Sequence, residues 1–142
     1  MNFELAFSVA GILAMTGWLT LLASPFIPKW SNWISGFIIP LILSFGYAGL
    51  FILSRQNEGG GFGSLAEVMT LFTYPDAALA GWVHFLAFDL FIGAWECRTA
   101  RFEEIRFWFV IPCLALTFMF GPLGLLVFLA LRAISKRGRL TD

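Results

Sequence analysis

A histidine and an aspartate interrupt an otherwise apolar run of the chain. The run over 81–91 reads GWVHFLAFDLF and contains His84 and Asp89. Imidazole and carboxyl groups are the side chains that enzymes most often use as general acids and bases. An ionisable group deep in a membrane helix is costly, so by default it faces the bundle interior and marks a functional site. These two residues therefore predict acid–base chemistry.

The spacing of the polar residues places them on different faces of one helix. Trp82, Asp89 and Glu96 follow one another at intervals of seven residues, which returns a helix to nearly the same face. His84 precedes Asp89 by five residues, which corresponds to about 140° of rotation. We therefore expect no direct bond between the pair. Each side chain needs a partner on another helix, or a ligand must lie between them.

A purely structural role for the pair is the first alternative. In that interpretation His84 and Asp89 bond polar groups on neighbouring helices and only fix the packing. The polar residues available for this are Thr16, Thr20, Ser44, Tyr47 and Thr117.

Metal binding and nucleophilic catalysis are weaker alternatives. A metal would need His84 and Asp89 together with Glu67 or Glu96, and the chain has one histidine, so no multi-histidine centre can form. We expect no metal and no cofactor. No Ser or Cys is placed at a strained turn as a nucleophile would be. Glu96 is expected to be a solvated partner of nearby arginines at the membrane boundary.

Composition indicates an all-α integral membrane protein. Of the 142 residues, 59% are hydrophobic and 13% are charged, whereas about a quarter of the residues in a soluble domain are charged. The net charge is zero and no basic block occurs, so we expect a lipid bilayer and not nucleic acid as a partner.

Four apolar stretches are long enough to cross a bilayer, which takes about 20 residues. They predict one domain over 1–142 with four transmembrane helices. The predicted spans are 3–24, 34–54, 77–95 and 107–131. A capping box at Ser64 and Glu67 predicts a short amphipathic helix through Phe72, between the second and third spans. Prolines and the Gly121-Pro122 step should bend the fourth span.

The orientation follows from the basic residues. Four spans would place both termini on one side. That side would carry Arg55, Arg132, Lys136, Arg137 and Arg139, and the other side Lys29, Arg98, Arg101 and Arg106. The terminal cluster predicts that both termini are cytoplasmic.

Aromatic residues make up 18% of the chain. This fraction fits lipid contact, and it also fits the binding of a flat conjugated ligand. If such a ligand binds, aromatic side chains would form the wall of its site and polar side chains would complete it. Four further residues are candidates for substrate binding. These are Trp82, Phe88, Glu96 and Thr117.

Three segments resemble the abscisic acid deficient 4 family of membrane proteins, which is implicated in neoxanthin synthesis. The first is the run of Trp82-Val83-His84 followed by Asp89-Leu90-Phe91. The others are the segments over 64–72 and 116–124. The resemblance covers roughly the whole chain and is closer to bacterial-type members than to plastid ones. It therefore implies a location in a bacterial inner membrane. Where many relatives carry a basic residue after the Asp-Leu-Phe run, this chain has Ala94.

The resemblance implies xanthophyll metabolism, with isomerisation of a carotenoid 5,6-epoxide to an allenic end group. That reaction needs an acid for the epoxide oxygen and a base for the adjacent polyene carbon, and it requires no redox cofactor. The resemblance implies that Asp89 is the acid and His84 is the base, or the reverse. Two other functions stay open: a non-catalytic carotenoid or lipid binder, and a small subunit of a larger membrane complex. Assembly of the chain into a homo-oligomer is a further possibility that the sequence leaves open.

Overall fold

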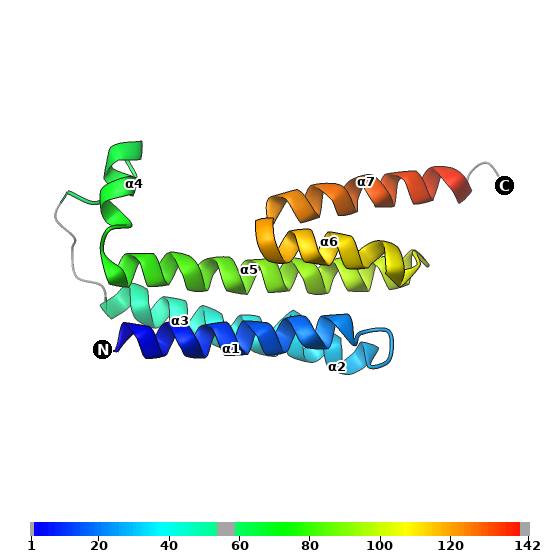
Figure 1. Cartoon of the computed structure of the whole chain (residues 1–142), viewed down its shortest axis with the longest axis horizontal. Coiled ribbons are helices and arrows are strands. Elements are labelled where there is room, and N and C mark those ends of the chain that lie inside the picture. The colour runs from blue at the N-terminus through cyan, green and yellow to red at the C-terminus, as the bar shows by residue number, and fades with distance from the viewer. Residues whose placement is uncertain (1, 54–58, 140–142) are drawn as a thin grey trace.

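The protein is all-helical. A computed structural model describes residues 2–53 and 59–139, and these contain helices and no strand. Three long helices, α1 (Phe3–Leu22), α3 (Ile39–Leu53) and α5 (Pro75–Phe102), run side by side (Figure 1). The all-α expectation is confirmed. Among the described residues, three segments are long and apolar enough to cross a membrane: Phe3–Leu22, Pro28–Ile52 and Pro75–Phe102.

The second span begins earlier than expected and contains a π-helical turn. Helix α2 (Pro28–Trp33) continues through the π turn η1 (Ile34–Ile38) into α3 without a break. Pro40 explains the turn, because a proline has no N–H and its ring collides with the carbonyl four residues back. A π turn relieves that collision by widening the helix locally. The N–H of Ile39 accordingly bonds the carbonyl of Ile34, five residues back.

The prediction that residues 107–131 form one membrane-spanning helix is wrong. The chain forms α6 (Phe107–Phe120) and α7 (Pro122–Arg139), which fold back against each other as a hairpin beside α5 (Figure 1). Gly121 has a φ of +34°, a conformation that glycine adopts without steric cost. Pro122 then begins α7, and proline is favoured at a helix start. At about 1.5 Å per residue, the 14 residues of α6 are too short to cross a hydrocarbon core of about 30 Å.

The hairpin places the end of α7 at a different end of the molecule from the one expected for four membrane spans. Helix α1 begins at one end of the molecule, and α7 ends at the opposite end, near the turn between α5 and α6 (Figure 1). The structure therefore does not support the expectation that both termini share one side. That expectation assumed that 107–131 crosses the membrane once.

A short helix precedes α5, as the capping box predicted. Helix α4 (Leu65–Leu71) begins after Ser64, whose hydroxyl accepts a hydrogen bond of 3.2 Å from the N–H of Glu67. The Glu67 carboxylate accepts a second bond of 3.0 Å from the N–H of Gly63. Helix α4 buries none of its residues and projects away from the bundle (Figure 1). Its contact with a membrane surface stays a prediction.

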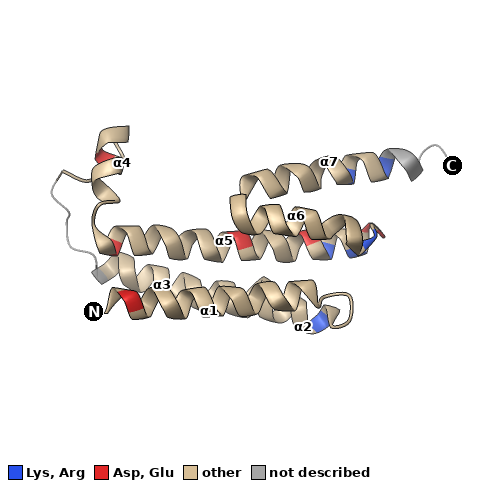
Figure 2. Ribbon diagram, in the orientation of Figure 1, with Lys and Arg blue, Asp and Glu red and all other residues tan. Residues whose placement is uncertain are grey.

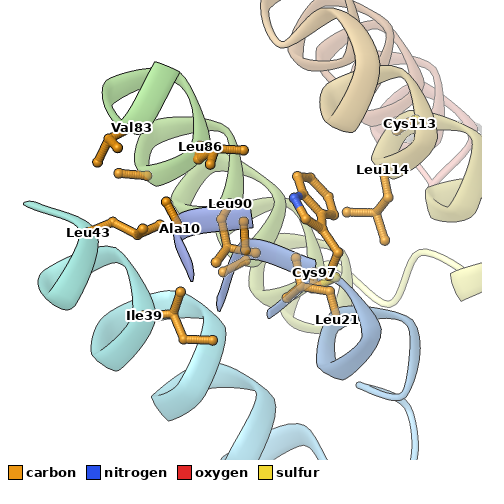
Figure 3. Packing of buried hydrophobic residues seen from close by; sticks show 14 of the residues in the cluster. Ala10, Leu21, Ile39, Leu43, Val83, Leu86, Leu90, Cys97, Cys113 and Leu114 are labelled. Atoms are coloured by element: carbon orange, nitrogen blue, oxygen red, sulfur yellow. The ribbon is translucent and has the colours of Figure 1, made fainter. Parts of the chain in front are cut away.

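The core lies between α1, α3 and α5 and continues toward α6. Figure 3 shows Leu21 of α1 and Leu90 and Cys97 of α5 lying close together. A methyl group added at Gly93 would lie 2.9 Å from the Trp18 ring, so the helices approach closely where residues are small, as in other membrane bundles. Cys97 and Cys113 are free and buried, which fits a role in packing.

An ion cluster fastens α7 to the turn between α5 and α6. The Arg132 guanidinium donates to both carboxylate oxygens of Glu103 at 2.5–2.8 Å, and Lys136 lies 3.1 Å away. The hydrogen bonds from Arg132 lower the pKa of Glu103 from 4.5 to about 2, with a further contribution from Lys136. The cluster joins the end of α5 to the far half of α7, so it holds the hairpin closed.

This cluster predicts a loss of stability in acid. The folded pKa of Glu103 is depressed, so its contribution is fully present above about pH 4.5 and disappears as the pH falls through about 2. We expect Glu103→Gln to lower the melting temperature in detergent at pH 7. The difference from the wild type should shrink as the pH approaches 2. Equal melting temperatures at pH 7 would show that the cluster does not stabilise the fold.

Candidate functional site

Asp89 lies at the tip of the α6–α7 hairpin. A methyl group added at Gly121 would lie 2.6 Å from Oδ1 of Asp89, so this glycine leaves the space that the carboxyl occupies. Oδ2 of Asp89 is buried and has no hydrogen-bond partner. The first N–H groups of a helix have no acceptor within the helix, and α7 begins at this tip. The carboxyl is therefore half-buried beside a break in the helical backbone.

Glu96 lies on the same face of α5 and is fully buried. Its exposed fraction is 0%, and its Oε1 accepts a hydrogen bond of 2.9 Å from the Thr117 hydroxyl of α6. Oε2 has no partner. The expectation of a solvated salt-bridge residue was wrong, because α5 continues to Phe102 and α6 covers this face. The seven-residue spacing was the sequence signal for this burial, because it places Glu96 on the same face of α5 as Asp89.

His84 lies on another face of α5 and is exposed. Its ring lies 5.8 Å from that of Tyr47 on α3 and 4.7 Å from that of Phe88, measured between ring centres. The expectation that the histidine faces the bundle interior was therefore wrong. The structure does not bring His84 to Asp89, in agreement with the rotation expected between them.

The aromatic candidates also face outward. Trp82 is 42% exposed and Phe88 is 56% exposed. The Trp82 ring lies 5.6 Å from the rings of Phe7 and Phe85. Of the predicted site residues, the structure thus groups Asp89, Glu96 and Thr117 at the hairpin and leaves the others on the outer surface of α5.

The polar residues of the structural alternative have other partners. The hydroxyls of Thr16 and Ser44 donate to carbonyls of their own helices, and Thr20 bonds the Ser35 hydroxyl and the Gly17 carbonyl. Of these residues, Thr117 alone bonds a carboxylate within the described part of the chain, and that carboxylate is Glu96. Within residues 2–53 and 59–139, neither Asp89 nor Glu96 forms an ion pair, and no group of three or more potential metal ligands occurs.

One family model matches most of the chain. The model described as ABA DEFICIENT 4-like matches residues 5–128. The chain belongs to this family. The match begins within α1 and ends within α7, and so includes every candidate site residue. No curated protein and no solved structure matches the chain.

Membership in the ABA4-like family indicates a membrane protein related to carotenoid or xanthophyll metabolism. The sequence alone did not reveal two features of this member's site. One is the close packing of Gly124 against Thr117, and the other is the bond from Thr117 to Glu96. Both depend on the reversal at Gly121, and the small residues at 121 and 124 were the available signal.

Proposed function

We propose that this ABA4-like protein isomerises an epoxy-carotenoid to an allenic carotenoid in a bacterial inner membrane, with Asp89 as the residue that transfers protons. One observation carries the proposal. Asp89 combines a carboxyl oxygen that has no partner with a position at a helix break inside the bundle. Irregular backbone at membrane depth is tolerated where protein buries it or where it lines a cavity.

The reaction needs one proton delivered and one removed. The acid protonates the epoxide oxygen, and the bond from that oxygen to the carbon next to the polyene breaks. The oxygen stays on the other ring carbon as a hydroxyl. Loss of a proton from the adjacent polyene carbon then forms the second of two cumulated double bonds. Atoms balance, and no electrons are gained or lost.

The arrangement favours Asp89 in both proton transfers. A protonated carboxyl can donate from one oxygen while its other oxygen accepts, and the net charge of the site then does not change. His84 is displaced from Asp89 by about 7.5 Å along α5 and about 140° around it. A base at His84 would therefore require the substrate to reach around the helix.

Pigment chromatography tests the proposal. Cells that make epoxy-xanthophylls would be compared with and without expression of this chain. We expect a new allenic peak that has the same mass as its precursor and appears only with the chain. Identical pigment profiles, with the protein present in the membrane, would contradict the isomerase function for these substrates.

A groove beside α1 supports a second candidate, the binding of a carotenoid or lipid chain without catalysis. The groove has a volume of about 530 Å³ and is lined by residues of α1 and α3 and by Val83 of α5. Gly46 and Gly49 of α3 widen it, because nothing lies within 4 Å of a methyl group added at either position. Asn2 is the polar residue at the N-terminal end of the otherwise apolar lining. The lining consists of Asn2, Leu5, Ala6, Val9, Ala10, Leu13, Ile42, Leu43, Gly46, Gly49, Leu50 and Val83.

Filling the groove should reduce binding. We expect Gly49→Leu to lower the pigment that co-purifies with the protein by about tenfold, since crowding of a packed site typically costs about 1–3 kcal/mol. The matched control is Gly11→Leu, where an added methyl also meets nothing within 4 Å but which does not line the groove. Equal pigment in the two variants would show that the groove is not the binding site.

A further inference from the structure

The basic residues that the structure describes gather at one end of the molecule, together with the acids Glu103 and Glu104 of the α5–α6 turn. Figure 2 shows basic residues on α2, at the end of α5 and on α7, all at one end. The described residues of this basic end include Lys29, Arg98, Arg101, Arg106, Arg132 and Lys136. The opposite end carries the acids Glu4, Glu67 and Asp76, and the structure describes no Lys or Arg there.

Exposed aromatic side chains occur at the same basic end. Trp30 and Trp33 of α2 are 68% and 62% exposed, and Trp108 at the start of α6 is 81% exposed. Trp is enriched at the level of the lipid headgroups, where its ring is half in water and half in hydrocarbon. The basic end therefore has the composition of a membrane interface.

Part of the positive charge at this end forms no ion pair with the part of the chain that the structure describes. Arg101 bonds the Asn32 side chain at 2.6 Å, and Arg132 and Lys136 bind Glu103. Lys29 and Arg106 are exposed and form no ion pair with the residues that the structure describes. These two side chains are available to a negatively charged group outside the protein.

We propose that the basic end lies in the cytoplasmic leaflet and binds anionic phospholipid headgroups there, and that the α6–α7 hairpin enters and leaves the membrane from that side. Basic residues are retained on the cytoplasmic side during insertion, and that leaflet carries the anionic lipids that attract them. The chain then crosses the membrane three times. Its N-terminal end faces away from the cytoplasm, and its last helix returns to the cytoplasm.

Cysteine labelling tests the arrangement in the full chain. Single cysteines would replace Phe62 before α4, Phe102 at the end of α5 and Ile134 of α7, which are 82%, 88% and 70% exposed. The native Cys97 and Cys113 are buried, so the wild type gives the background. In spheroplasts, an impermeant maleimide should label Phe62→Cys and leave Phe102→Cys and Ile134→Cys unlabelled. All three should react after detergent permeabilisation.

Two labelling results would overturn the proposal. If Ile134→Cys labels together with Phe62→Cys, the last segment crosses the membrane and no re-entrant hairpin exists. If Phe102→Cys and Ile134→Cys label in spheroplasts while Phe62→Cys does not, the basic end faces away from the cytoplasm.

Lipid analysis tests whether anionic phospholipid binds at the basic end. Wild-type protein purified from bacterial membranes should retain phosphatidylglycerol in preference to phosphatidylethanolamine. We expect the double variant Lys29→Gln/Arg106→Gln to reduce that preference by about fivefold for each charge removed. The control Glu4→Gln/Glu67→Gln changes two charges at the opposite end and should leave the preference unchanged. Retention that does not differ between the two double variants would contradict lipid binding at the basic end.

Discussion

Replacement of Asp89 by asparagine is expected to abolish the isomerised pigment and to leave the fold in place. The amide has nearly the same shape as the carboxyl, so it fits the space beside Gly121. It cannot donate and accept the proton as a carboxyl does, and the loss of a general acid–base group typically costs about 10²–10⁴-fold in rate. Allenic product would be measured by chromatography at equal amounts of membrane-inserted protein.

Two matched variants separate the roles of the polar residues around Asp89. Glu96→Gln removes the other buried carboxyl of this face but keeps an oxygen that can accept the bond from Thr117, so we expect most of the activity to remain. His84→Ala should also keep activity if Asp89 makes both proton transfers. Loss of product in His84→Ala with normal folding would assign the base to the histidine. Full activity of Asp89→Asn would contradict the mechanism itself.

Much of the helical framework could be predicted from the sequence. Hydropathy located the three long spans, because a bilayer requires about 20 apolar residues whatever the tertiary structure. The capping box at Ser64 marked the start of α4 correctly, because a cap depends on residues adjacent in the chain. The spacing of Asp89 and Glu96 likewise predicted their common face, since it follows from helix geometry alone.

The fourth span could not be predicted in the same way. A hydropathy window over 107–131 is equally apolar whether the chain crosses the membrane or reverses at Gly121. Glycine followed by proline indicated a break, but its angle depends on whether α7 can pack against α6. That packing depends on Gly124 and on the cluster at Glu103, which joins residues far apart in the sequence.

The predictions of where the side chains of His84 and Glu96 lie were wrong for a related reason. The cost of charge in lipid predicts that His84 should be shielded, and the position of Glu96 beside the arginines predicts that it should be solvated. Neither argument says which face of α5 a neighbouring helix covers. The hairpin covers the face of α5 that carries Asp89 and Glu96. His84 lies on another face, where its ring contacts those of Tyr47 and Phe88. The reversal at Gly121 therefore determines which of the candidate residues are grouped into a site.

Gly124→Ala is expected to be among the most destabilising single-methyl changes in the chain. The added carbon would collide with the backbone nitrogen and the hydroxyl of Thr117. Backbone atoms cannot move aside as a flexible side chain can, so we expect a cost at or above the range of about 1–3 kcal/mol for overpacking. Displacement of Thr117 would also remove the hydrogen bond to Glu96. Activity should fall together with stability.

Thermal unfolding in detergent would measure the effect, followed by the reaction of the buried Cys113 on α6 with a thiol-specific dye. The matched control is Gly11→Ala in α1, where the same methyl meets nothing within 4 Å. The control should be neutral or slightly stabilising, because alanine favours a helix over glycine by about 1 kcal/mol. Equal melting temperatures of the two variants would mean that α6 and α7 do not pack as a hairpin. The site at Asp89 would then have to be rebuilt on a fourth membrane span.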